Sequence, residues 1–180
     1  MKHSFSIASI VSIFYLLSIS PASAQNITYD DDFTQTCEMK APGKTIVKRG
    51  HLTFDGAEYL SMEYTDPEGE YFIVDGIKVK INLGGKKNEL NASKVNSVRL
   101  KRATLLNCLA GNWENAAKAI NAETSVTESK DSRNVTLTVK GKVPRGGYSS
   151  VQLTYRTSDG KVQKMVLVES TGIRNTYTLN

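Results

Sequence analysis

Apolar and polar residues alternate with a period of two along most of the chain. The pattern is clearest where Val79, Ile81 and Leu83 alternate with lysine and asparagine. Comparable runs cover residues 50–54, 60–65, 135–139 and 151–156. Such alternation places apolar side chains on one face of a β-sheet. Short turn-forming segments, Asp-Gly, Pro-Glu-Gly and Gly-Gly, separate the runs. The sequence therefore predicts roughly ten strands joined as sequential antiparallel hairpins.

One region, residues 93–122, breaks this alternation. Its apolar residues recur at spacings of three and four, which is typical of helices. They are Val95, Val98, Leu105, Leu106, Leu109, Trp113, Ala116 and Ile120. Gly111 interrupts the pattern, and Asn112 is placed to cap a second short helix. We therefore expect one or two helices between a first and a second group of strands.

The parity of the strands predicts which side chains face the interior. This inner face comprises Leu52, Phe54, Leu60, Met62, Tyr64, Phe72 and Val74, and the same parity extends it to Ile77, Val79 and Ile81. The run at 71–74 is apolar at both parities, which predicts a strand covered on both sides. A sheet with one apolar face must be covered. The helical region is the main candidate cover, over either a packed core or a hollow apolar cavity.

The N-terminus has the form of a secretory signal peptide. Lys2 and His3 precede an apolar run, and Ala22-Ser23-Ala24 matches a small-x-small cleavage site. The run is shorter than the roughly 20 residues that span a bilayer, although an uncleaved anchor is the alternative interpretation. We expect residues 1–24 to be a signal peptide and residues 25–180 to be one exported domain.

Charge gives a weaker indication of partners. Lysine and arginine outnumber aspartate and glutamate by 23 to 18, and this excess is dispersed. It lacks the interleaved aromatics or motif of a nucleic-acid-binding domain, so we expect no nucleic-acid partner. Arg99, Lys101 and Arg102 form the densest cluster. They either steer the protein toward anionic membranes or an acidic partner, or they form an ordinary solvated surface.

The sequence offers little for catalysis. His51 is the only histidine outside the predicted signal peptide, and it lies on the polar side of its strand. The acidic run at 29–32 lacks the spaced ligands of a calcium loop. No glycine-rich phosphate loop precedes a helix. We therefore predict a protein that is not an enzyme, with no catalytic residue, metal site or cofactor.

Two cysteines, Cys37 and Cys108, remain to be explained. An oxidising compartment would permit a disulfide between them. Neither spacing nor context pairs them, however, so two free thiols are the equal alternative.

Several short motifs occur in the order typical of one family. They are Phe-Thr-Gln at 33–35, "GHLTF" at 50–54, "IVDG" at 73–76 and "TLLNCLAGNW" at 104–113, followed by the closing strands from 151 to 179. In order and spacing the chain resembles LolA, the periplasmic carrier of outer-membrane lipoproteins. The resemblance implies a mainly β fold: an incompletely closed antiparallel barrel, that is, a strongly curved sheet, with a helical lid over an apolar cavity.

The resemblance also implies a function. The chain would bind acyl chains of lipoproteins released from the inner membrane and deliver them to the outer membrane, as a periplasmic monomer. Its partners would be acylated lipoproteins, an inner-membrane lipoprotein-release transporter and an outer-membrane acceptor. The predicted inner face would line the acyl cavity, and Leu105, Leu106, Leu109 and Trp113 would form the lid. Where the family usually has Arg-Pro, with the arginine holding the lid, this chain has Gly56-Ala57.

Two other classes of function remain open on the sequence. The chain could be a binding module or sensor for another amphiphilic lipid or glycolipid. It could also be a structural or adhesion domain without a cavity.

Overall fold

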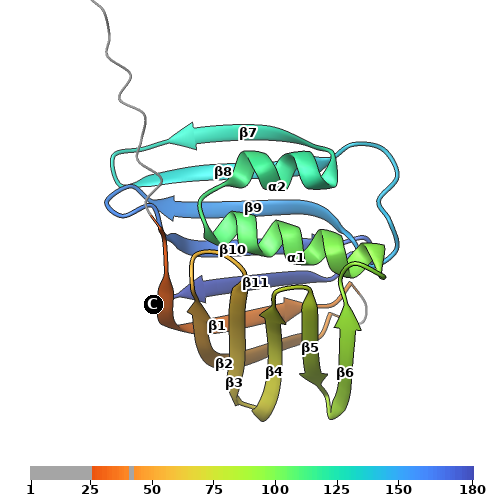
Figure 1. Cartoon of the computed structure of the whole chain (residues 1–180). Helices are drawn as coiled ribbons and strands as arrows, with labels where there is room; N and C mark the ends of the chain where they lie inside the picture. Colours follow the sequence, from red (N-terminus) through yellow and green to blue (C-terminus); the bar gives the residue numbers. More distant parts are fainter. Residues whose placement is uncertain (1–25, 41–42) are drawn as a thin grey trace, which may run out of the picture.

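The computed structural model describes residues 26–40 and 43–180, which form one antiparallel sheet of eleven strands and two helices (Figure 1). The first strands are β1 (Tyr29–Glu38), β2 (Thr45–Phe54), β3 (Tyr59–Asp66), β4 (Glu68–Asp75), β5 (Lys78–Leu83) and β6 (Lys86–Asn91). The helices α1 (Asn96–Leu109) and α2 (Trp113–Ile120) follow. The last strands are β7 (Ala122–Glu128), β8 (Ser132–Val139), β9 (Tyr148–Arg156), β10 (Val162–Glu169) and β11 (Arg174–Leu179).

The mainly β class and the number of helices are as the sequence predicts. The predicted signal peptide, residues 1–24, lies outside the described residues. Among the described helices, none has the length and apolar character needed to cross a bilayer.

The sheet is built from two hairpin series that meet in its middle. Its strand order is β6-β5-β4-β3-β2-β1-β11-β10-β9-β8-β7. Among the strands of residues 26–40 and 43–180, the only pairing that is distant in sequence is β1 with β11, in which Phe33 lies opposite Leu179. The predicted sequential order of strands therefore holds within β1–β6 and within β7–β11. It does not hold where the two series meet, because β1 pairs with β11. The sheet is strongly curved and open, with β6 and β7 at its edges, and both helices lie on its inner face (Figure 1).

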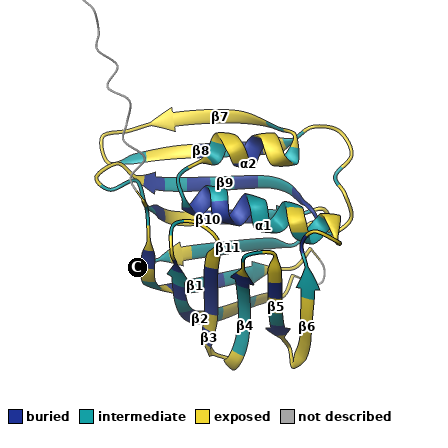
Figure 2. Cartoon of the chain, viewed as in Figure 1, coloured by how far each residue is buried: buried dark blue, intermediate teal, exposed yellow. Residues whose placement is uncertain are grey.

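The inner face carries the core. Leu52 lies opposite Met62, and Leu60 lies opposite Val74, so the apolar side chains of neighbouring strands are in register. Burying one such side chain is worth about 1.5–3 kcal/mol. All the predicted inner-face residues of β2 and β3 are buried, as are Val74 and Val79, while Phe72 and Ile81 pack partly buried against them (Figure 2). Alternation thus predicted the orientation of these strands correctly.

Ile77 is an exception, and its predicted inward orientation is wrong. Asp75 lies opposite Lys78, which leaves Gly76 and Ile77 as the two-residue turn between β4 and β5. Ile77 is 54% exposed. The parity of β5 begins only after this turn, so the alternation was extended one position too far toward the N-terminus.

The expectation that β4 is covered on both sides is also wrong. Tyr71 and Ile73 lie on the outer face, opposite Asn82 and Lys80 of β5. They are half-buried, and neither described helix covers that face. The aliphatic stems of neighbouring polar residues can shield such side chains without a second layer.

The two helices are separated by a short link. Gly111 adopts a φ of +75°, a conformation that residues with a Cβ rarely adopt, and so ends the path of α1. Asn112 stands at the N-cap of α2, as expected from its position, but its side chain makes no capping hydrogen bond. The turn of the chain here therefore depends on the glycine and on burial of Ala116 and Ala117 in α2.

The two cysteines are free thiols, so the disulfide that the sequence left open is not formed. Cys108 is fully buried within α1, and burial raises its pKa to about 12. Cys37 is half-buried on β1; burial, followed by the charge of Glu169, raises its pKa. Both thiols are therefore protonated and weakly reactive at neutral pH.

The outer face of the sheet holds a compact charged cluster around His51 of β2. Its Nε2 lies 2.7 Å from Asp30 Oδ1 and its Nδ1 lies 2.9 Å from Asp32 Oδ1. The hydrogen bonds to Asp32 and Asp30 raise the pKa of His51, because both ring nitrogens must carry protons to donate to two carboxylates. Two members of the acidic run at 29–32 thus hold a histidine on the outer face.

We predict that His51 makes folding pH-dependent. Its pKa is raised in the folded state, so its stabilising effect is complete below its unfolded value of about 6.5 and disappears as pH rises through the folded value. At pH 6 the free energy of unfolding of His51→Gln should therefore be lower than that of the wild type, by less than about 1 kcal/mol because these side chains are exposed. At pH 9 the two values should be equal. NMR titration of the His51 ring checks the shift directly. An unshifted ring, or one unaffected by Asp32→Asn, would contradict it.

Candidate functional site

An apolar cleft lies between α1 and the inner face of the sheet. We call it the α1 cleft; its volume is about 230 Å³. Its apolar wall consists of Met62, Phe72, Ile81, Leu83, Leu105, Tyr148 and Leu167, and its polar wall of Gln35, Lys48, Tyr64, Lys101, Glu169, Asn175 and Tyr177. Strands from both halves of the sheet contribute, so the curvature of the sheet creates this cleft.

The cleft brings together only some of the residues predicted from sequence. Met62, Tyr64, Phe72 and Ile81 line it, and Leu105 closes it from the side of α1. Apart from the turn residue Ile77, the other predicted inner-face residues are fully buried in the core: Leu52, Phe54, Leu60, Val74 and Val79. Contact of any of these residues with an acyl chain stays a prediction.

The four predicted lid residues have different surroundings. Leu105 lines the α1 cleft, whereas Leu106 faces a shallow pocket beside Gly56 on another side of the helix. Leu109 is fully buried and Trp113 packs partly buried against the core. Leu105 is thus the lid residue placed to meet a ligand in the α1 cleft.

Three residues of the polar wall, Tyr64, Gln35 and Asn175, form a connected hydrogen-bond network that was not predicted from the sequence. The Tyr64 hydroxyl donates to Gln35 Oε1 at 2.7 Å, and Gln35 Nε2 donates to Asn175 Oδ1 at 2.9 Å. Lys48 Nζ lies 5.4 Å from the centre of the Tyr64 ring. Burial raises the pKa of Tyr64, so its hydroxyl remains a donor. Parity could have placed Gln35 inward, since it is two residues from the fully buried Phe33.

Helix α1 is held down by polar contacts with both halves of the sheet. Lys101 Nζ binds Glu169 Oε1 at the end of β10, 2.7 Å away, and lies 5.1 Å from the centre of the Tyr148 ring. Arg102 donates to the carbonyl of Gly76 and lies 3.7 Å from Glu58. The Tyr155 hydroxyl donates to the Cys108 carbonyl at 2.9 Å. In this chain the cations that hold the helix come from the helix itself, and the Gly56-Ala57 turn supplies none.

These contacts alter the interpretation of the basic cluster at 99–102. The charges of Lys101 and Arg102 are used within the chain, and Arg99 donates to Asn96 at 2.7 Å. Two of the three cations are therefore paired within the chain, and the steering role of the cluster stays a prediction.

A second cleft of about 190 Å³ lies on the other side of α1. It is lined mainly by Leu100, Ala119, Ile120, Val139, Pro144 and Tyr148, with Lys101, Lys140 and Lys142 at its border. Lys101 and Tyr148 line both clefts. Their contact therefore forms part of the wall between two apolar spaces.

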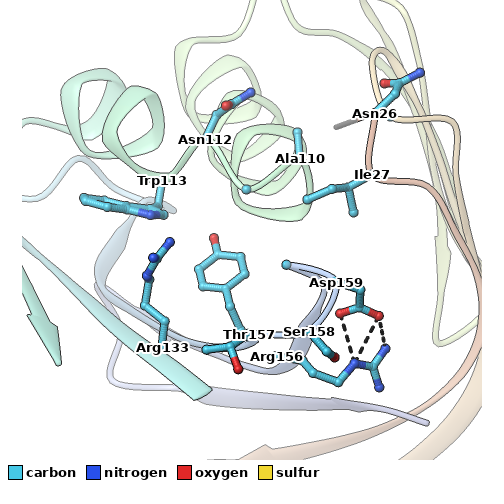
Figure 3. Close-up of a pocket in the computed structure, with 14 residues that line it drawn as sticks. Asn26, Ile27, Ala110, Asn112, Trp113, Arg133, Arg156, Thr157, Ser158 and Asp159 are labelled. Carbon is cyan, nitrogen blue, oxygen red and sulfur yellow. Dashed lines mark hydrogen bonds and ion pairs between the residues drawn. The ribbon is translucent and has the colours of Figure 1, made fainter. Parts of the chain in front are cut away.

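A larger pocket of about 620 Å³ has a different chemistry (Figure 3). It lies where the α1–α2 link faces the turn between β9 and β10, and its walls include Trp113, Arg133 and Tyr155. Arg156 and Asp159 form an ion pair within its wall. Charged and amide side chains, Asn26, Asn112, Arg133, Arg156 and Asp159, stand among its apolar ones, so it is a poorer place for a hydrocarbon chain than the smaller clefts. Within residues 26–40 and 43–180, no group of three acidic, histidine or cysteine residues is arranged to hold a metal ion.

We predict that the polar network stabilises the folded protein. Tyr64→Phe removes the donor to the buried Gln35 oxygen, and an unsatisfied buried acceptor costs about 1–3 kcal/mol. Tyr71→Phe, on the outer face of β4, is the matched control and should change stability by less than about 0.5 kcal/mol. Chemical denaturation measures both. Equal losses in the two variants would show that the network contributes nothing specific.

Several solved structures are similar to this chain at low sequence identity. No curated protein matches the chain. A LolA superfamily protein from Nitrosomonas europaea is 10% identical, with a TM-score of 0.40 over 86% of this chain and 84% of that one. The MucA/MucB complex of Pseudomonas aeruginosa matches at 12% identity and a TM-score of 0.47, over 87% of this chain and 52% of that one. The lipoprotein LppX of Mycobacterium tuberculosis matches at 11% identity and a TM-score of 0.34, over 84% and 85%.

The decisive comparison is with a family model. The model for the outer membrane lipoprotein carrier protein LolA matches residues 24–180, which is nearly the whole chain. The curved open sheet, the two helices on its inner face and this match together show that the chain belongs to the LolA family.

Proposed function

We propose that this protein is a periplasmic carrier that binds the acyl chains of lipoproteins between α1 and the sheet and delivers them to the outer membrane. The observation that carries the proposal is the α1 cleft, whose apolar wall is closed by Leu105 of the helix. Membership of the LolA family supports the same role. The predicted signal peptide at 1–24 would export the chain to the compartment where such cargo travels.

In this proposal α1 is the movable lid and α2 is its anchor. Helix α2 approaches β7 and β8 more closely than α1 approaches any strand. α1 is attached through long side chains, notably Lys101 to Glu169 and Arg102 to Gly76. Lifting α1 would part Lys101 from Tyr148 and join the α1 cleft to the second cleft. One continuous apolar groove would then be open to the cargo.

The proposed cycle needs no nucleotide in the carrier. Each methylene group moved out of water gains about 0.8 kcal/mol, which drives capture. Closure of the lid returns apolar side chains to the same space, which offsets that gain and permits release. An inner-membrane release transporter would load the carrier and an outer-membrane acceptor would unload it.

Native mass spectrometry of the protein purified from its own periplasm tests the proposed cargo. We expect a fraction of the molecules to carry the additional mass of an acylated protein, lost after treatment with detergent. A bound free lipid or glycolipid would favour a binding module or sensor for another amphiphile. An empty protein that also binds no added lipopeptide would refute the carrier role.

Substitution of one leucine in α1 and one in the sheet tests whether the helix competes with the ligand. Leu105→Ala removes a side chain from the cleft, so the closed state should weaken more than the loaded state and lipopeptide affinity should rise severalfold. Leu137→Ala is the control, because Leu137 is fully buried on β8, outside α1, and lines none of the clefts described above. It should cost about 2–5 kcal/mol of stability with no gain in affinity.

Thermal unfolding and lipopeptide titration of both variants provide the two measurements. Equal affinities in the two variants, with large losses of stability in both, would show that Leu105 is fixed core. Leu106→Ala should also raise affinity, because Leu106 would lose its burial whenever α1 is displaced.

A further inference from the structure

The charges that line the α1 cleft are paired. Two lysines contribute to its polar wall, Lys48 from β2 and Lys101 from α1. Lys48 forms an ion pair with Glu70, and Lys101 forms one with Glu169 at 2.7 Å. The cleft thus presents basic side chains whose charge is already neutralised by partners from the sheet.

The Lys48–Glu70 pair is well shielded from solvent. The side chains are 18% and 10% exposed, respectively. One carboxylate oxygen of Glu70 accepts from Lys48, and the other accepts from the backbone N–H of Gly84 at 2.7 Å. Burial alone would raise the pKa of Glu70, but these hydrogen bonds and the charge of Lys48 outweigh it and lower the pKa. Glu70 is therefore ionised and fixed in place at neutral pH.

An anionic ligand would meet an obstacle in this cleft. To bind Lys48 it would have to displace Glu70, leaving a shielded carboxylate without its cation, or lie beside it as a second negative charge. Breaking a shielded ion pair by removing one partner is strongly unfavourable. The more exposed Lys101–Glu169 pair presents a weaker obstacle of the same kind.

A neutral carbonyl group would meet no such obstacle. Asn175 accepts from Gln35 through Oδ1, which leaves its amide nitrogen as an uncharged donor at the same end of the cleft. A carbonyl can accept such a bond without disturbing either ion pair. The apolar wall of Phe72, Ile81 and Leu105 would then hold the attached hydrocarbon.

We propose that Glu70 is a specificity-determining residue, which neutralises Lys48 so that the cleft accepts acyl chains in ester or amide linkage and rejects free fatty acids. This inference rests on the proposed carrier function and adds a selection rule to it. The rule would keep the cleft free of fatty acid anions that have the same hydrocarbon chain as the cargo.

Isothermal titration with two ligands of equal chain length tests the rule. Myristate and 1-monomyristoylglycerol present the same acyl chain, so burial of methylene groups cancels in the comparison. At pH 8 the acid is ionised, since an ordinary carboxyl group has a pKa of about 4. We expect the ester to bind at least about tenfold more tightly, in line with the cost of disrupting a hydrogen-bonded charge.

Glu70→Gln provides the decisive variant. It retains an oxygen that can accept from Gly84 but releases Lys48, so myristate affinity should rise by about tenfold while ester affinity stays unchanged. Glu68→Gln is the matched control, because it removes the same charge from an exposed position of the same strand. The double variant Lys48→Gln/Glu70→Gln should bind myristate more weakly than Glu70→Gln does, since no free cation remains at that position. Thermal unfolding confirms that each variant is folded.

The outcomes separate the two proposals. If the wild type binds myristate as tightly as the ester, or if Glu70→Gln behaves like Glu68→Gln, the selection rule is wrong and the carrier role stands. If neither ligand nor a lipopeptide binds the wild type, the carrier role fails and the rule fails with it.

Discussion

The single apolar face of the sheet is the constraint on which the rest of the structure depends. Eleven strands spaced about 4.8 Å apart make a surface roughly 48 Å wide. Two helices, each about 10–12 Å in diameter, can cover only about half of that width. Curvature of the sheet hides much of the remainder by bringing β3–β5 toward β9–β11. The clefts beside α1 are what this incomplete cover leaves.

The order of elements along the chain determines how that cover can move. Both helices are inserted between β6 and β7, the two edge strands, so the hydrogen-bond ladder of the sheet runs through β1 and β11 without involving them. Displacing α1 therefore breaks side-chain contacts but no strand pairing. The link at Gly111 allows α1 to change direction while α2 remains on β7 and β8. Insertion of both helices between the two edge strands thus leaves the sheet intact when α1 is displaced.

Local rules predicted much of this fold. Alternation gave the inner face of β2 and β3 because each strand has one buried side, and helical spacing located α1 and α2. Local rules failed where tertiary context decides. The alternation in β5 does not indicate that Ile77 belongs to the turn before it. The pairing of β1 with β11 depends on contacts that are distant in sequence.

The polar wall of the α1 cleft was missed for a related reason. A sequence pattern assigns lysine, glutamine and asparagine to the outer face, yet Lys48, Gln35 and Asn175 point inward. Their burial becomes acceptable only through partners supplied by other strands, such as Glu70 for Lys48 and Tyr64 for Gln35. Such partnerships cannot be recognised until the strands are placed side by side. Departures from simple patterning are expected where a site must contact a ligand.

Reversible transfer requires that capture should not be too favourable. A chain of sixteen carbons gains roughly 12 kcal/mol on leaving water, which corresponds to nanomolar binding and slow release. Leu105, Leu106 and Leu109 would together lose about 5–9 kcal/mol of burial if the opened helix exposed them to water. The net gain of the proposed carrier is therefore a fraction of the transfer energy, and an acceptor with a preformed groove needs only a modest advantage. A cavity without a lid would bind the same chain too tightly to release it, which gives the helix a role in delivery as well as in protection of the core.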